Sequence, residues 1–374
     1  NIHYIRGEYD LALKKYAETI ILKKEVEHNV DLSAVLSNIG AVHLDKGELN
    51  KALAYFNQSL RYISNSNDEA AKAFRYINIG RIYIIKGDLD IALDFLGKAS
   101  EVYKNLENKF LLARSLSFTG SIYLYQKKLD LAEKYLLLSL EYHNSFENAF
   151  QVSKTLYIMI QVKVEQVQRL EASSYLQRLK KIEKQKANPI VTLRYLLAKA
   201  LIYKRENRLS RKYSAMELYQ KIIQNPLLNG IIKMEAKLGF CELLIMEFEL
   251  LMNPILPDEI FALIDQIYKY GQQEQAYTFI INGLILKSRM VFIQKEITKA
   301  YKLLEIADFY CDERQLSLCK SKIGETREVF NSKTVRHQEF ISSQRSQLKP
   351  LKNQDILEYL EDLKNFKFKF ENQI

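Results

Sequence analysis

The sequence predicts an all-α solenoid of about seven helix-turn-helix repeats followed by a C-terminal helical tail. First, only 12 Gly and 5 Pro occur in 374 residues, and no Pro precedes Pro189, so the first half contains few helix breakers. Second, small and apolar residues recur at one fixed interval along the chain. Third, these residues follow the helical period on both sides of a short turn. Stacked helix pairs explain all three observations.

Three columns of residues define the period most clearly. A small residue on the first helix lets the second helix approach closely, and Phe56, Leu96 and Leu136 are expected to fill the remaining space. Gly47 and Gly87 suit a positive φ at the end of the first helix. The columns are Gly40, Gly80 and Gly120; Leu49, Leu89 and Leu129; and Ala52, Ala92 and Ala132.

The regularity of the pattern decreases along the chain. Beyond Gly324 the repeat pattern stops and the sequence becomes polar, with Pro350 near the end. The predicted organisation is a repeat array over 1–312, with regular units over 1–140 and degenerate, basic units over 141–312. A capping helix follows over 313–331, and then a polar linker over 332–374 that includes a short amphipathic helix at 355–366.

One unit shows a specific motif: Gly80, Tyr83, Gly87-Asp88-Leu89, Ala92, Leu96 and Ala99. This motif resembles the tetratricopeptide repeat family, and the 40-residue period resembles the extended repeats of Pins-type scaffolds, kinesin light chains and bacterial Rap-like regulators. The resemblance implies a right-handed superhelix, whose concave groove is lined by the first helix of each unit. It also implies that the groove binds a protein or peptide.

The net charge of +10 is concentrated in one stretch. Residues 145–225 contain 16 Lys and Arg against six Glu, whereas the rest of the chain is balanced. Such a stretch leaves open RNA or DNA binding, because cations neutralise phosphates and aromatic rings stack on bases. The tyrosines available for stacking are Tyr157, Tyr175, Tyr195, Tyr203 and Tyr213.

Signals of catalysis, metal binding and membrane insertion are absent from the sequence. It contains no GxGxxG, GxxxxGK[ST], HExxH or GxSxG motif. The scattered Cys241, Cys311 and Cys319 favour reduced thiols and a cytoplasmic location over a disulfide framework or a zinc site. The longest apolar run, 240–252, is interrupted by three Glu. We expect no enzyme activity, cofactor or metal, and the start at Asn1 inside a predicted helix suggests a fragment of a longer protein.

Two asparagines are candidate peptide-binding residues. Asn38 and Asn78 each lie two residues before the small position of their unit. The family resemblance implies that an Asn here contacts the backbone of an extended peptide, and an amide offers a donor and an acceptor for that purpose. Exposed helical asparagines without a ligand are the alternative interpretation.

A second candidate column lies six residues before the small position. It places Phe74, Arg114, Lys154 and Arg194 on one face, so three consecutive units carry a cation. Fixed cations along a groove would attract carboxylates, although long basic side chains can also simply solvate an exposed face. Arg81 and Tyr125, which follow Gly80 and Gly120, would flank the same groove.

These observations favour a protein-interaction scaffold that holds an extended or helical, acidic partner segment in a concave groove. The alternatives are a Rap-like regulator that senses a peptide, and nucleic-acid binding through the basic units at 145–225. An N-terminal helical bundle would distinguish the Rap-like class, and the sequence does not contain one.

Overall fold

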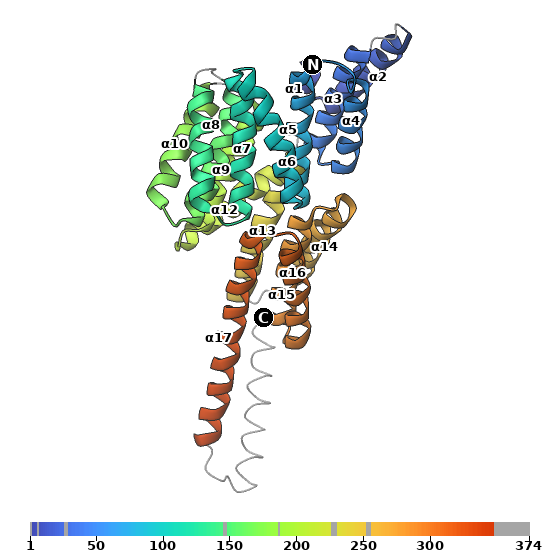
Figure 1. The fold of residues 1–374 in the computed structure, drawn as a ribbon. Helices are drawn as coiled ribbons and strands as arrows, with labels where there is room; N and C mark the ends of the chain where they lie inside the picture. Colours follow the sequence, from blue (N-terminus) through green and yellow to red (C-terminus); the bar gives the residue numbers. More distant parts are fainter. Residues whose placement is uncertain are drawn as a thin grey trace. The chain divides into compact units, whose positions relative to one another are not determined.

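A computed structural model describes residues 2–5, 7–25, 29–144, 148–185, 188–225, 230–251 and 256–347. The secondary structure of these residues is helical, and the all-α superhelical prediction is confirmed (Figure 1). The chain divides into two compact units, residues 1–323 and 324–374. The helices are α1 (Ile2–Ile5), α2 (Tyr9–Glu25), α3 (Asn29–Lys46), α4 (Leu49–Tyr62), α5 (Glu69–Lys86), α6 (Leu89–Asn105), α7 (Lys109–Tyr125), α8 (Leu129–Asn144), α9 (Ala149–Glu165), α10 (Arg169–Gln185), α11 (Pro189–Lys204), α12 (Leu209–Ile223), α13 (Gly230–Leu251), α14 (Leu256–Glu274), α15 (Tyr277–Ile293), α16 (Ile297–Glu313) and α17 (Ser317–Gln347).

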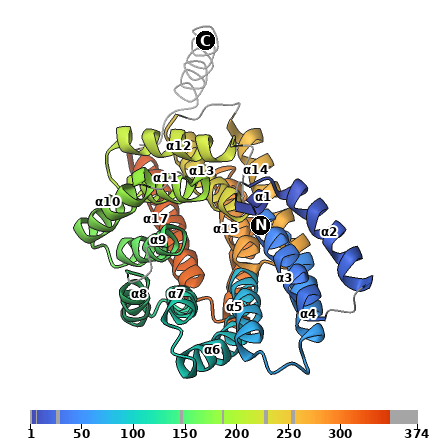
Figure 2. The same cartoon turned by 90° about the horizontal axis from the view of Figure 1, so that it is seen from above.

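Consecutive antiparallel pairs build the first unit. Seven pairs run from α3/α4 to α15/α16 in the described part of the chain, preceded by α1 and α2. From α3 to α12, the first helix of each pair faces the interior and the second lies outside (Figure 2). The first helices of successive pairs therefore line one concave surface.

The predicted packing of small against large residues is confirmed. A Cβ built on Gly40 would lie 3.1 Å from the ring of Phe56, and one on Gly120 would lie 2.7 Å from Leu136 Cγ. Phe56 and Leu136 are both buried. The glycine columns are thus explained by close contact between the two helices of a pair.

The helix starts also follow the repeat. Asp68, Asn108, Asn148 and Asn188 are N-cap residues that occupy the same position in successive repeats. Each side chain accepts a hydrogen bond from a backbone N–H in the first turn, as Asn108 Oδ1 does from Leu111 N at 3.0 Å. These caps satisfy donors that the helix itself leaves unpaired, and so they fix the start of α5, α7, α9 and α11.

The turn inside each pair has the same backbone conformation in the first five units, with or without glycine, and Lys295 in the α15/α16 turn shares it. Gly7, Gly47 and Gly87 have φ of 78°, 81° and 90°, as predicted for the latter two, and Lys127 and Val167 follow at 57° and 61°. A β-branched residue is rarely found in this left-handed region because its side chain crowds the backbone. Val167 is therefore held in a strained conformation by the helices on either side.

Replacing Val167 with Asn is expected to raise the free energy of unfolding by about 1 kcal/mol, because Asn tolerates a positive φ and a left-handed L-residue costs about 1–2 kcal/mol. Urea denaturation followed by circular dichroism would measure the change. Lys127→Asn, at the matching turn, should give a smaller gain because Lys is not β-branched. An unchanged or lower stability for Val167→Asn would show that the turn is not strained.

Later helices pack against the turns of the early repeats, although the two regions are far apart in sequence. The Tyr270 hydroxyl donates to the Gly47 carbonyl at 2.9 Å, and Asn50 N donates to Glu274 Oε2 at 3.0 Å. A Cβ on Gly47 would lie 3.2 Å from Cα of Gly230, at the start of α13. One hydrophobic cluster joins the two regions, with Leu44, Leu49 and Phe56 on one side and Ile231, Phe240 and Phe279 on the other.

The next turn, between α5 and α6, is held in the same way. Lys86 Nζ donates to the Glu274 carbonyl at 2.8 Å and to Asn50 Oδ1 at 2.6 Å. Arg314 pairs with Asp88. The superhelix therefore brings α13 to α16 and the start of α17 back against its first repeats, an arrangement that the sequence pattern did not predict.

The C-terminal end differs from the expectation of a capping helix at 313–331 and a linker at 332–374. α17 continues as one helix from Ser317 to Gln347. Residues 325–347 contain neither Gly nor Pro, and polar composition alone does not end a helix. The amphipathic helix predicted at 355–366 lies outside the described residues.

Candidate binding site

Four cations from four successive repeats converge in the interior of the superhelix. Arg81 comes from α5, Arg114 from α7, Lys154 from α9 and Arg194 from α11. Each is close enough to influence another: Arg81 lowers the pKa of the other three. We call these four residues the cation cluster.

Arg81 has an acidic partner from the neighbouring repeat. Its Nη2 lies 3.3 Å from Oδ1 of Asp45, at the C-terminal end of α3. The Tyr4 hydroxyl donates to the other oxygen of Asp45 at 2.7 Å. Burial raises the pKa of Tyr4 well above its usual value, and Asp45 adds to this effect, so Tyr4 is a hydrogen-bond donor at neutral pH.

Arg114 is engaged by two of the other predicted site residues. Its Nη2 donates to Asn78 Oδ1 at 2.6 Å, and its guanidinium lies over the Phe74 ring at 4.8 Å from the centroid. Asn78 Nδ2 in turn donates to the Phe74 carbonyl at 3.1 Å. The predicted residues therefore form one contact group, in which Asn78 and Phe74 position Arg114.

Arg194 and Lys154 repeat this cation–aromatic arrangement in the next units. The Arg194 guanidinium lies 4.3 Å from the Phe150 centroid, and Lys154 Nζ lies 3.5 Å from the Phe118 centroid. Arg194 is 6% exposed and also donates to the Phe150 carbonyl at 2.8 Å. In each pair the cation and the ring come from adjacent repeats.

A cavity of about 100 Å³ lies against this cluster, and we call it the cationic chamber. Arg81, Lys154, Arg194 and Tyr125 line it, together with Glu235 from α13. Burial lowers the pKa of Arg194 to about 10 and of Lys154 well below its usual value, with the neighbouring arginines adding to the effect. Burial raises the pKa of Glu235 despite the hydrogen bond from Tyr157. The chamber is thus short of negative charge.

The depressed pKa of Lys154 predicts a specific pH dependence. Between the folded pKa and the unfolded value of about 10.4, the unfolded chain holds one more proton at this site, so stability rises with pH across that window. Lys154→Met should remove this rise and should be more stable than the wild type at the lower pH. Urea denaturation of both proteins from about pH 6 to pH 10 would test this. If the unfolding free energies of the two proteins changed with pH in parallel, the pKa of Lys154 would not be depressed.

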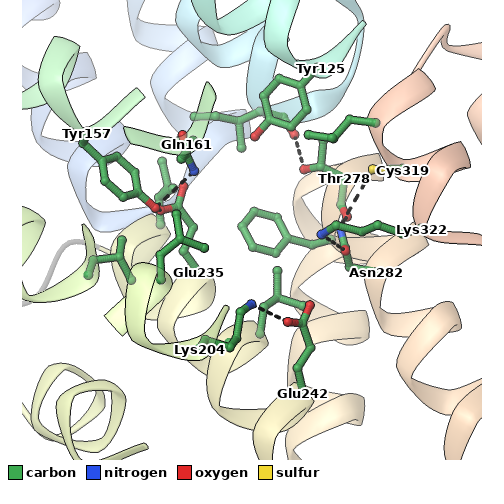
Figure 3. Close-up of a pocket in the computed structure, with 18 of the residues that line it drawn as sticks. Tyr125, Tyr157, Gln161, Lys204, Glu235, Glu242, Thr278, Asn282, Cys319 and Lys322 are labelled. Atoms are coloured by element: carbon green, nitrogen blue, oxygen red, sulfur yellow. Dashed lines mark hydrogen bonds and ion pairs between the residues drawn. The ribbon is translucent and has the colours of Figure 1, made fainter. Parts of the chain in front are cut away.

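Figure 3 shows a second chamber. Its volume is about 160 Å³, and it adjoins the first because the two share lining residues. Tyr125, Tyr157 and Glu235 line both cavities. Across the second chamber, Lys204 pairs with Glu242. Burial would raise the pKa of the Glu242 carboxyl, but Lys204 and other nearby cations hold it at about 2. This chamber is closer to charge balance than the first.

The predicted site residues fall into three groups. Arg81, Tyr125, Lys154 and Arg194 line the cationic chamber; Phe74, Asn78 and Arg114 form the adjacent contact group; and Asn38 lies half-buried on α3, outside the lining. Asp45 and Glu235 were not predicted as site residues from the sequence. Asp45 occupies the same repeat position as Tyr125, two units earlier, which could have indicated it. Glu235 is on an irregular unit without such a signal.

The tyrosines considered for base stacking lie in varied positions. Tyr157 points into the chambers and donates to Glu235 at 2.9 Å (Figure 3). Tyr203 lies between Lys199 and Arg211, 5.4 Å and 4.5 Å from its centroid. Only Tyr213 of the described five exposes more than a third of its surface. Tyr157 and Tyr203 therefore already contact other side chains of the chain.

Membrane-spanning helices and clusters of metal ligands are both absent from the described helices. No helix there combines the length and the apolar character that crossing a membrane requires. No group of three or more His, Cys, Asp or Glu side chains among the described residues is placed to hold a metal ion. The three cysteines are buried and are not bonded to one another.

The geometry defines a helical-repeat protein with a cationic interior, and comparison with known proteins identifies the type of its first repeats. The tetratricopeptide repeat family matches residues 1–63 and 69–145, which include the regular repeats. Residues 1–145 therefore contain tetratricopeptide repeats, as the motif predicted. The Photosystem I assembly protein Ycf3 of Rippkaea orientalis (strain PCC 8801 / RF-1) is 48% identical over 54 residues. This match covers 14% of the chain and 30% of the length of that relative.

Solved structures with similar folds extend over most of the chain. Aspartyl phosphate phosphatase F from Bacillus subtilis has a TM-score of 0.50 at 19% identity, covering 78% of this chain and 73% of its own. A Rap protein in complex with Competence and Sporulation Factor has a TM-score of 0.55 at 14% identity, covering 84% and 87%. These likenesses show a shared superhelical fold.

Proposed function

We propose that the chain binds an acidic segment of a partner protein or peptide in the cationic chamber. Tetratricopeptide repeats generally mediate protein–protein interaction, and this family assignment sets the class of function. The observation that carries the finer proposal is the convergence of Arg81, Arg114, Lys154 and Arg194 from four consecutive repeats. Their arrangement makes a carboxylate-bearing ligand the best electrostatic match.

The depressed pKa values of Lys154 and Arg194 reflect an unfavourable environment for their charged forms. Burial and mutual repulsion destabilise the charged form of Lys154 and Arg194, and only part of this cost is offset by Asp45 and Glu235. A ligand carboxylate would relieve the repulsion and form charge-assisted hydrogen bonds with a guanidinium. The predicted Asn38 and Asn78 would support such a ligand, with Asn78 acting through its hydrogen bond to Arg114.

One structural neighbour supports ligand binding by a protein of this fold. The Rap protein with a TM-score of 0.55 was solved with Competence and Sporulation Factor bound. A Rap-like regulator that senses a peptide is therefore the second candidate function. In both candidate functions the ligand would occupy the interior surface. A scaffold would only hold its partner, whereas a regulator would change its activity when the peptide binds.

Binding of two matched fluorescent peptides would test the proposal. One peptide is rich in Asp and Glu, and the other carries Asn and Gln at the same positions. The acidic peptide is expected to bind at least about 10-fold more tightly, with a preference that weakens as salt rises. Equal affinity for both peptides at low salt would refute the acidic-ligand proposal.

A further inference from the structure

An exposed apolar ledge lies at the turns of the α9/α10 and α11/α12 pairs, and none of its residues lines the two chambers. Val167 is 72% exposed and Leu170 is 89% exposed. Leu209, at the start of α12, is 52% exposed. We call Val167, Leu170 and Leu209 the apolar ledge. Large apolar side chains left exposed at adjacent turns are candidates for an interaction surface.

A cavity of about 380 Å³ opens beside the ledge. Val164, Val167, Ala172 and Ile202 supply its apolar lining. A cavity of this size is large enough to hold several water molecules. Apolar side chains of a partner would displace that water favourably.

The ledge continues a surface that the chain already uses for packing. At the three preceding turns, Gly47 contacts Gly230, Gly87 contacts Leu316, and Lys127 donates to Ser321. Val167 occupies the next equivalent position, one repeat after Lys127, and is largely exposed. The same type of turn surface that accepts helices in the earlier repeats is therefore available here.

The backbone of Val167 is a second, independent indication. A valine at a φ of 61° is strained, and its exposure adds no packing energy that would compensate for the strain. A polar residue such as Asn would tolerate the positive φ, and its side chain would be hydrated by solvent. Strain of this kind, retained at an exposed position, is typical of functional sites.

Basic residues surround the ledge. Arg169 and Arg205 line the cavity, and Arg208 and Arg211 follow on the α11/α12 turn and α12. Glu165 lies 3.0 Å from Arg205, and Glu206 lies 3.5 Å from Arg211, so positive charge remains in excess. We propose that the apolar ledge docks an acidic amphipathic helix of a partner protein, with its apolar side chains in the cavity and its carboxylates facing these arginines.

Fluorescence anisotropy with a designed helical peptide would test this surface. The probe carries Leu at helical spacing on one face and Glu on the flanks, and a matched probe carries Lys in place of Glu. The full chain is expected to bind the acidic probe at least about 10-fold more tightly than the basic one. Val167→Asn combined with Leu170→Ser should weaken acidic binding at least about 10-fold.

Single variants distinguish the loss of docking at the ledge from a loss of folding stability and from a loss of binding in the cationic chamber. Val167→Asn relieves strain, so weaker binding together with a denaturation midpoint that is not lowered supports a lost contact. Ile91→Asn, a matched change on α6 where Ile91 is also exposed, should bind normally. Lys154→Glu should leave the affinity of the ledge for the probe unchanged, while it lowers the affinity of the cationic chamber for an acidic ligand. If only Lys154→Glu weakened binding of the acidic probe, the proposal that the ledge docks a partner would be wrong. It would also be wrong if the chain self-associated and Val167→Asn abolished that association, because the ledge would then bind a second copy of the chain.

Discussion

Replacing Lys154 with Glu is expected to lower the affinity for an acidic peptide by at least about 100-fold. Lys154 lies in the cationic chamber within reach of Arg81, Arg114 and Arg194. The substitution removes one attraction and places a carboxylate beside the ligand, and like charges brought together in a binding site cost several kcal/mol. A loss of about 2.7 kcal/mol corresponds to 100-fold in Kd. Titration calorimetry with the acidic peptide would measure the change.

The folded structure should accept this substitution. A glutamate at position 154 would face three arginines whose mutual repulsion it reduces, so the denaturation midpoint should not fall. Lys128→Glu is the matched control, because Lys128 is exposed and lies over Tyr123 rather than in the chamber. An equal loss of affinity in both variants would indicate a general charge effect and contradict a specific site.

Replacing Gly230 with Ala is expected to destabilise the chain by about 2 to 3 kcal/mol and to loosen the packing of α13 on the first repeats. A Cβ at this position would lie 2.9 Å from the Lys46 carbonyl carbon and 3.1 Å from Cα of Gly47, and closer still to the Lys46 oxygen. All three atoms belong to the backbone, so no side-chain rotation can relieve the clash. Urea denaturation and small-angle X-ray scattering would detect the lower stability and a larger radius of gyration.

Gly97→Ala is the control for this substitution. Gly97 lies within α6, and a Cβ built there would have no atom within 4 Å apart from the neighbouring backbone of its own helix. Alanine is a better helix former than glycine, so this variant should gain up to about 1 kcal/mol. If Gly230→Ala behaved like Gly97→Ala, the contact between α13 and the α3/α4 turn would not be a close one.

The local architecture could be predicted from sequence because it repeats. The columns of Gly40, Gly80 and Gly120 indicated the helix pairs, and their contacts with Phe56 and Leu136 follow from size alone. The turn at Val167 was harder to predict, since its positive φ is imposed by the flanking helices rather than by the residue. The backbone conformation of this turn follows the position in the repeat rather than the residue type, and it was predicted from the sequence only at Gly47 and Gly87.

The candidate site could be predicted only in part. The spacing placed Arg114, Lys154 and Arg194 on one face, but it could not show that Asn78 binds Arg114. Glu235 enters the chamber because α13 packs against α3 and α11, and a repeat period reports only on neighbouring units. Long-range packing of this kind depends on the accumulated superhelical rotation, which no single motif encodes.

The contact between early and late repeats changes how the array should unfold. Repeat proteins ordinarily behave as one-dimensional chains of modules that can fray from either end. Here Lys86, Asp88 and Asn50 tie the first repeats to residues near the far end of the array. The first and the last repeats of the array therefore contact each other, so unfolding of either one exposes the packed surface of the other. Folding must also close a long loop before these contacts form, which favours slow, concerted assembly over repeat-by-repeat growth.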